Sequence, residues 1–124
     1  MSDAIRLEVR RRDWITANQR HHYHERGRRV KVIRTAARIK AEMDEIAPRD
    51  RARILVVVRW PDRRRRDVHN LFPTIKAAVD GLVDAGVLPD DDDTHLIGPD
   101  LRVDRDTLAP KDRVVLTMHL EEAP

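Results

Sequence analysis

The sequence predicts an α+β domain in which two helices pack on one mixed sheet, in the order β-α-β-α-β-β. Two stretches carry apolar residues at helical spacing, and four short stretches have the alternating or continuous apolar runs of strands. The chain has 124 residues, enough for one domain but too few for two ordinary ones. We therefore expect a single domain over residues 1–124, with its helices covering the sheet.

The first half begins with a strand at residues 5–10, where apolar and polar residues alternate. Residues 11–28 are polar and basic, and we expect them to be mostly loop. A helix is predicted from Arg28 to Ile46, because apolar residues recur at steps of four and three, with Pro48 marking its end. The single apolar stripe of this helix consists of Val32, Ala36, Ile39, Met43 and Ile46.

The run ILVVVRW at residues 54–60 is short, apolar and rich in β-branched side chains, which predicts a buried central strand. Pro61 ends it, because proline cannot donate to a central ladder. A second helix is predicted at residues 71–85, with Pro73 in its first turn and Gly86 as its C-terminal cap.

Gly81 lies inside this second helix, where glycine costs about 1 kcal/mol relative to alanine, and we interpret it as a point of close packing. The run LPDDDD at 88–93 is expected to be a loop. Residues 95–103 predict a strand or irregular edge interrupted at Gly98-Pro99, and residues 113–120 predict the last strand.

Charge is divided unevenly along the chain. Residues 1–66 hold 20 Lys or Arg and 9 Asp or Glu, a balance of +11, whereas residues 67–124 hold 5 and 13, a balance of −8. A basic half favours a polyanionic partner and an acidic half favours cation binding, so nucleic acid with a divalent metal would satisfy both. The alternative is that the two halves neutralise each other within the fold.

Other features exclude some classes of protein and site. The chain has no cysteine, which excludes disulfides and thiolate metal sites and fits a reducing cytoplasm. No apolar stretch approaches the ~20 residues of a membrane span, and no secretory segment begins the chain, so we expect no membrane partner.

The stretch RRRRDVHN, at residues 63–70, carries the strongest chemical signal. If it is extended, Asp67 and His69 leave the same face and could hold one ion together. The acidic run 90–93 could add oxygens, but the helix between the two segments spans about 22 Å. The segments meet only if the following loop returns along the helix or if a dimer completes the site, and both possibilities stay open.

Two interpretations are open for Lys76 and two for Arg63–Arg66. Lys76 could stabilise negative charge on a phosphate or protonate a leaving oxygen, or it could simply pair with Asp80 four residues on. Arg63–Arg66 could hold a DNA backbone bidentately, or form a solvated basic loop.

The histidines and aromatic residues add little. The run RHHYH at residues 20–24 favours phosphate contacts or a plain loop over a metal site, because adjacent histidines seldom form a complete site alone. His95 and His119 fall in predicted strands and are expected to be structural. Aromatic residues are only 3% of the chain, which favours recognition of DNA backbone and shape over base stacking.

The segment PDRRRRDVHNL, followed by IKAAVDGLVDAGVLPDD, resembles the RusA family of Holliday-junction resolvases, which are crossover junction endodeoxyribonucleases. The resemblance is clearest from Pro61 to about Asp93 and extends weakly to ITANQRHHYHERGRR near the N-terminus. It implies Mg²⁺-dependent cleavage of four-way DNA junctions by a homodimer, with paired nicks in recombination and repair. The expected location is the cytoplasm of a bacterial or phage-infected cell.

The resemblance also implies roles for individual residues. The catalytic residues would be Asp67, Lys76 and Asp91. The metal would be held by Asp67, His69, Asp90 and Asp91, with Asn70 beside these ligands. DNA would be bound by Arg63, Arg64, Arg65 and Arg66, together with Arg20, Arg28 and Arg29.

The sequence departs from the family pattern at His69, where the family has its second acid. Magnesium prefers oxygen ligands, whereas imidazole suits manganese and later transition metals better. Three outcomes follow: a magnesium site built on Asp67 and the acidic run, a site that prefers Mn²⁺, or a protein that binds junctions without cutting them. A small basic DNA-binding domain without junction preference is a further alternative.

Overall fold

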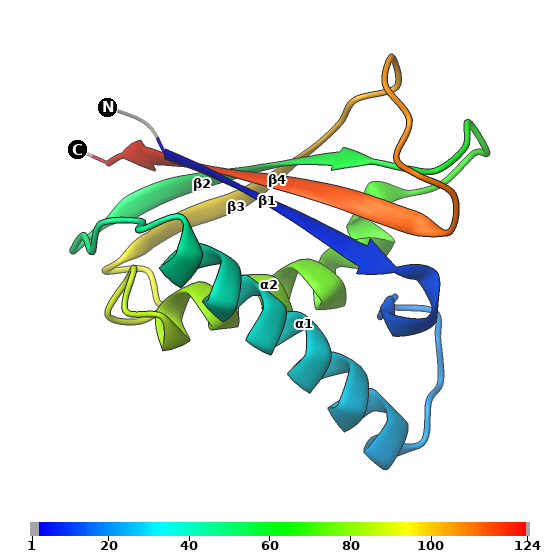
Figure 1. Ribbon diagram of the computed structural model, residues 1–124, viewed down its shortest axis with the longest axis horizontal. Coiled ribbons are helices and arrows are strands. Elements are labelled where there is room, and N and C mark those ends of the chain that lie inside the picture. The colour runs from blue at the N-terminus through cyan, green and yellow to red at the C-terminus, as the bar shows by residue number, and fades with distance from the viewer. Residues whose placement is uncertain (1–2, 124) are drawn as a thin grey trace.

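The computed structural model describes residues 3–123 as two helices packed on one face of a mixed four-stranded sheet (Figure 1). The strands are β1 (Asp3–Arg10), β2 (Ala52–Arg59), β3 (Leu96–Val103) and β4 (Arg113–Glu122). The helices are α1 (Tyr23–Met43) and α2 (Phe72–Asp84), with 3₁₀ turns η1 (Arg11–Asp13) and η2 (Val68–Leu71). The predicted fold class and element order are confirmed.

The sheet has the order β1-β4-β2-β3. The C-terminal strand β4 lies between β1 and β2 and is antiparallel to both, while β3 pairs in parallel with β2 and forms the edge. The predicted interruption of β3 is also present: Gly98 has a positive φ, and the register with β2 shifts between Arg53 and Leu55. The expectation of a buried central strand for residues 54–60 is likewise confirmed, since β2 has neighbours on both sides.

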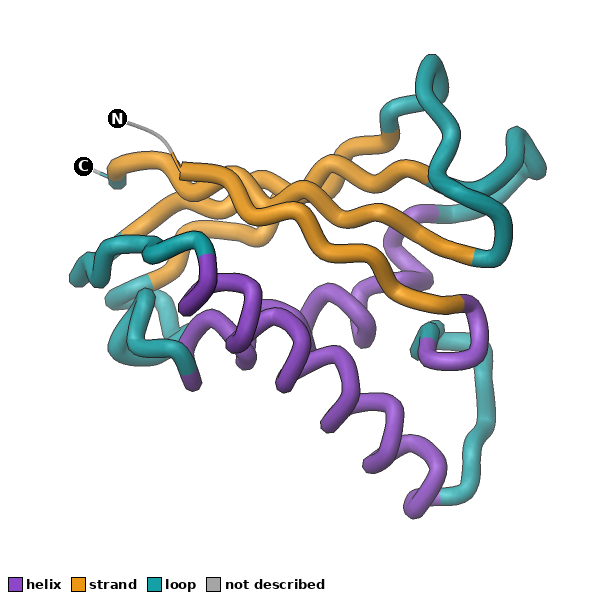
Figure 2. Tube along the Cα trace, viewed as in Figure 1, coloured by secondary structure: helices purple, strands orange, loops and turns teal. Residues whose placement is uncertain are grey.

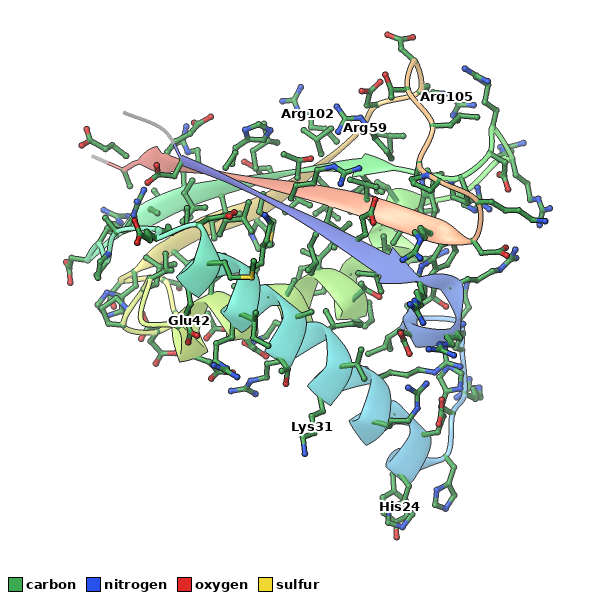
Figure 3. All side chains as sticks on the ribbon, in the orientation of Figure 1. His24, Lys31, Glu42, Arg59, Arg102 and Arg105 are labelled. Atoms are coloured by element: carbon green, nitrogen blue, oxygen red, sulfur yellow. The ribbon has the colours of Figure 1, made fainter. Side chains whose placement is uncertain are left out.

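The core lies between the sheet and the helices. The alternation of each strand sends one set of side chains toward the helices, as in β2, where Ile54, Val56 and Val58 are fully buried. The opposite face of the sheet carries polar side chains, and Arg59 and Arg102 rise from it (Figure 3). Within residues 3–123, no helix is long and apolar enough to span a bilayer.

Helix α1 corrects two expectations. It begins at Tyr23, so residues 23–28 are helical and not loop, and it ends at Met43, before Ile46. Its buried residues are Ile33, Ala37 and Ala41, a stripe one position away from the expected one.

The apolar stripe expected on α1 is instead largely exposed. The exposed fractions are 40% for Val32, 43% for Ile39 and 72% for Met43, and only Ala36 and Ile46 are partly buried against the core. Such a stripe normally faces the core of a globular domain. Here the small residues of the adjacent stripe face the core and let the helix approach closely.

Helix α2 matches its predicted bounds to within one residue. Proline stands in its first turn, and Gly86 follows its end with φ 81° while its N–H donates to the Val83 carbonyl at 2.9 Å. A Cβ at Gly81 would overlap the Arg34 carbonyl of α1 and lie 2.7 Å from the Ala37 Cβ. Gly81 is therefore where the two helices come into close contact, as expected.

Three connections emerge from the same end of the sheet: residues 11–13 after β1, residues 60–67 after β2, and residues 104–112 before β4 (Figure 2). They are tied together through backbone hydrogen bonds. Arg11 N–H donates to the Asp112 carbonyl at 2.8 Å, and Ala109 N–H donates to the Trp60 carbonyl at 2.9 Å. We call this the basic end of the molecule.

Candidate functional site

The start of α2 is fixed to the segment that follows β1. Thr74 is fully buried, and its hydroxyl both donates to the Ile15 carbonyl and accepts from the Ile15 N–H, each at 2.8 Å. Ala17 N–H donates to the Asn70 carbonyl, also at 2.8 Å. Residues 15–17 therefore run alongside the turn that carries Asp67 and His69, and hold it in place.

Asp67 and His69 lie together, though not in the way an extended segment would bring them. Asp67 caps the 3₁₀ turn η2, and its Oδ1 accepts from the His69 N–H at 3.0 Å. This turn brings the His69 Nδ1 within 3.4 Å of the same Oδ1. Both side chains are mostly exposed, at 64% and 78%, so an incoming group can reach them.

A hollow of about 340 Å³ opens beside Asp67. Trp14 and Trp60, whose rings meet edge to face at 5.5 Å between centroids, contribute to its wall. The residues lining the hollow are Trp14, Thr16, Asn18, Trp60, Arg65, Arg66, Asp67, Asn70 and Leu71. The hollow therefore joins a candidate metal ligand to two of the arginines predicted to bind DNA.

The arginines of residues 63–66 are not equivalent. Arg66 forms two hydrogen bonds with Asp62, at 2.6 and 3.2 Å, and its guanidinium lies 4.7 Å from the Trp60 ring centroid. The hydrogen bonds from Arg66 and from the Arg64 backbone hold the Asp62 pKa at about 2, so this carboxylate is ionised at neutral pH.

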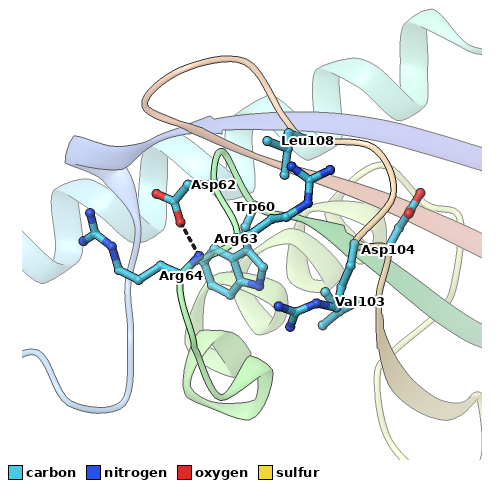
Figure 4. A pocket seen from close by; sticks show the side chains of 8 residues that line it. Trp60, Asp62, Arg63, Arg64, Val103, Asp104 and Leu108 are labelled. Atoms are coloured by element: carbon cyan, nitrogen blue, oxygen red, sulfur yellow. Dashed lines mark hydrogen bonds between the residues drawn. The ribbon is translucent and has the colours of Figure 1, made fainter.

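Arg63, Arg64 and Arg65 are exposed, and their guanidiniums pair with no carboxylate of the described chain. Arg63 turns toward Leu108 of the neighbouring connection, while Arg64 points away from it (Figure 4). We call residues 63–65 the arginine loop. Its three cations are available to an external anion without breaking an internal ion pair.

The basic residues before and within α1 are arranged differently. Arg28 hydrogen-bonds Glu25 and the buried Asp13, with its contact to Asp13 at 2.9 Å, and Arg29 bonds both Glu25 and the Trp14 carbonyl. The bonds from Arg28 and Arg29 lower the Glu25 pKa to about 2. Arg28 and Arg29 thus fasten α1 to the segment after β1, while Arg20 is exposed.

Lys76 joins α2 to the acidic loop. Its Nζ contacts the Asp80 carboxylate at 2.6 Å and also the Asp91 carboxylate. The expected pair with Asp80 is confirmed, and the loop after α2 does return along the helix far enough for Asp91 to reach Lys76. Partial burial lowers the Lys76 pKa, but the two carboxylates outweigh it and the net shift is upward; the Lys76 contact in turn lowers the pKa of Asp91.

The candidate metal ligands form two groups. Asp67 and His69 contact each other. Asp91 instead contacts Lys76, and the Asp91 N–H donates to Asp90 Oδ1 at 2.7 Å. Over residues 3–123, no three His, Asp or Glu side chains gather in a group that could hold a metal. The donors present fit a cation with one or two protein ligands, completed by water and a substrate phosphate, as Mg²⁺ often is.

The other histidines have local contacts. His22 caps α1, accepting from the His24 N–H at 3.3 Å, and the rings of His22, Tyr23 and His24 lie against one another. His95 Nδ1 lies 2.7 Å from the Asp50 carbonyl, in agreement with the structural role expected for it.

Sequence reasoning missed Thr16, Asn18 and Trp60 as neighbours of Asp67. No sequence pattern links these residues to Asp67, because the hollow forms only once β1 and β2 lie in one sheet. Comparison with protein-family models and with curated proteins finds no match for this chain.

Proposed function

We propose that this protein is a metal-dependent, structure-selective endodeoxyribonuclease that cuts branched DNA, such as four-way junctions, by paired nicks in recombination or repair. The observation that carries the proposal is the hollow shared by Asp67, Arg65 and Arg66. It puts the exposed carboxylate of Asp67 next to the guanidinium of Arg65, which has no carboxylate partner, and phosphodiester hydrolysis needs such a carboxylate beside a group that binds phosphate. The resemblance of residues 61–93 to the RusA family supports the same reading.

Each residue has a role in this proposal. The arginine loop would bind the sugar–phosphate strand, and Asp67 and His69 would hold Mg²⁺ or Mn²⁺ against it. The cation, when bound, would activate a water molecule and neutralise charge on the phosphate. Asn70 lines the hollow beside these ligands.

Lys76 of α2 and Asp91 of the loop that follows α2 would assist. Lysine is protonated at neutral pH, and the two carboxylates raise the Lys76 pKa further, so Lys76 can stabilise negative charge on the phosphate. Asp91 would hold Lys76 in this protonated form. Asp90 and Asp91 reach the cation only if the acidic loop shifts when DNA binds.

The test is a nicking assay with labelled four-way junction and linear duplex, in Mg²⁺, Mn²⁺ or EDTA. We expect nicks confined to the junction, lost in EDTA and reduced at least about 100-fold in Asp67→Asn. Asp106→Asn is the matched control, since it removes one exposed carboxylate at the basic end. Equal activity of both variants would remove Asp67 from the mechanism.

A second candidate is a protein that binds junctions without cutting them. It is favoured by the separation of Asp67 and His69 from Asp91, which is paired with Lys76. Tight junction binding with no product in either metal would establish it. His69→Asp restores the acid of the family pattern, and under the nuclease proposal it increases Mg²⁺-dependent nicking.

We also propose a homodimer, because two related nicks call for two equivalent sites. The exposed stripe Val32, Ile39 and Met43 of α1 supports it, since the spacing matches the apolar seam of paired helices. Sedimentation of Ile39→Lys should give a monomer, whereas Leu108→Lys, at an exposed apolar residue of the basic end, should leave the dimer intact. Unchanged mass in both variants would place the contact elsewhere.

A further inference from the structure

A second cluster of cations lies at the basic end, apart from the arginine loop. Arg10, Arg11 and Arg12 at the end of β1 surround an open hollow of about 640 Å³ together with Lys111 and Arg113 at the start of β4. Asp112 is the one carboxylate among the described residues that line it. We call these five cations the basic hollow, and its lining carries a net charge of +4.

The sheet register places two of these cations against each other. Arg10 and Arg113 are direct cross-strand partners in the antiparallel pair of β1 and β4. Like charges directly opposite each other destabilise a sheet. An arrangement that weakens the fold without a compensating contact is expected where the residues serve another purpose.

The fold does not neutralise the basic hollow internally. In the described part of the chain, no carboxylate forms an ion pair with any of its five cations. Elsewhere arginines are matched, as Arg34 is with Asp84 and Arg59 with Asp104. Glu8 and Asp13 line an adjoining hollow with some of these cations, but Glu8 pairs with Arg6 at 3.2 Å and Asp13 pairs with Arg28 at 2.9 Å.

The hollow is held in a defined shape. The hydrogen bond from Arg11 N–H to the Asp112 carbonyl joins the two segments that form it. The Arg11 guanidinium lies 5.7 Å from the Trp14 ring centroid, so its position is supported by an aromatic face. Arg10 and Arg113 are thus presented by the ends of two paired strands, and the other three cations lie within two residues of those ends.

The basic hollow and the arginine loop lie on neighbouring parts of the same end. Strand β4 separates β1 from β2, and Val115 of β4 pairs with Arg59, next to the residues that lead into the arginine loop. With strands about 4.8 Å apart, β1 and β2 are about 10 Å from each other.

We propose that the basic hollow seats the sugar–phosphate backbone of DNA beside the stretch of backbone held by the arginine loop. This inference rests on the proposed action on DNA and adds to it a second contact surface. It accounts for the unpaired cations and for the opposed arginines, because a bound phosphate between them turns their repulsion into attraction.

The test is the salt dependence of DNA binding in EDTA, with labelled linear duplex and four-way junction. The triple variant Arg10→Gln/Arg12→Gln/Lys111→Gln should lose about 10- to 100-fold in affinity near 0.15 M salt, and its slope of log affinity against log salt should fall by about 2 to 3. The matched control is Lys31→Gln/Arg53→Gln/Arg102→Gln, which removes the same charge from other exposed sites; Lys31 and Arg102 are marked in Figure 3. The control should change affinity less than about threefold.

Equal losses in the two triple variants would reduce the effect to net charge and overturn the inference. No loss in the first variant, or no DNA binding by the natural chain, would overturn it as well.

A single substitution tests the opposed arginines. Arg113→Thr should raise the thermal midpoint by about 1–3 °C while it weakens DNA binding, because the repulsion with Arg10 and the phosphate contact disappear together. A lower midpoint would mean that Arg113 stabilises the sheet, and the inference would lose its second support.

The readouts separate this inference from the nuclease proposal. If the first triple variant loses affinity and the natural chain makes no nicks, the DNA-binding surface stands and the nuclease proposal falls. If the natural chain nicks junctions and the triple variant binds them equally well, the nuclease proposal stands and the surface falls.

Discussion

The arginines at the start of α1 and those of the arginine loop look alike in sequence and differ in what surrounds them. Arg28 and Arg29 bond Glu25, Asp13 and a backbone carbonyl, so they connect parts of the fold. The arginine loop has no carboxylate partner in the described chain and extends into solvent. A run of arginines therefore indicates a polyanion site only where the fold leaves its charges unmatched.

The largest expected difference between these two groups of arginines is in DNA binding. Changing Arg63, Arg64 and Arg65 together to glutamine should weaken junction binding about 10- to 100-fold near 0.15 M salt, because about three phosphate contacts are lost. The measurement is fluorescence anisotropy as salt is varied. The free energy of unfolding should change by less than about 0.5 kcal/mol, as is usual for exposed positions.

The next largest effect should be on stability. Asp13→Ala removes the buried acceptor of Arg28 and should lower the free energy of unfolding by about 1–3 kcal/mol, measured by denaturant unfolding. The salt slope of DNA binding should stay the same. A smaller slope would show that Arg28 contributes to the DNA contact in the natural chain and that the loss of Asp13 disturbs this contact.

A conservative exchange should separate the two groups further. Arg28→Lys cannot reproduce a fork that reaches Glu25, Asp13 and the Arg12 carbonyl, so the thermal midpoint should fall by about 2–4 °C. Arg64→Lys keeps a point charge for phosphate and should change DNA affinity less than about twofold. Equal sensitivity at both positions would contradict the contrast between them.

The smallest effect should be on proton binding. The pKa values of Glu25 and Asp62 are both lowered to about 2, chiefly by hydrogen bonds from Arg28 and Arg66 respectively. Such carboxylates stabilise the fold above their ordinary pKa, and the contribution is lost as pH falls through about 2. Of these two carboxyls, Arg28→Gln should raise the pKa of Glu25 and not that of Asp62, and Arg66→Gln the reverse, as followed by NMR titration of the carboxyl carbons.

Most of the fold could be predicted because its signals are local. The bounds of α2 follow from Pro73, helical spacing and Gly86, and β2 follows from a run of β-branched residues. Helix α1 was predicted with the wrong side inward because its sequence offers two adjacent stripes. Periodicity favours the larger side chains Val32, Ile39 and Met43, whereas close contact with Gly81 selects the stripe with Ala37 and Ala41.

The candidate site could be predicted only in part. The closeness of Asp67 and His69 follows from their spacing, although a capped 3₁₀ turn and not an extended strand produces it. The contact of Asp91 with Lys76 depends on the path of the loop after α2, which composition does not determine. The pairing of Arg28 with Asp13 depends on where the segment after β1 lies, and no local pattern reports it.

The position of β4 has a consequence for synthesis of the protein. Of the four strands, β4 is the last to leave the ribosome and lies in the interior of the sheet, where its residue Leu120 pairs with Asp3 of β1. Until β4 has been made, β1 has no neighbour and β2 lacks one of its two partners, so nascent chains expose unpaired strand edges. We expect stop codons before β4 to give insoluble fragments and not partly active ones.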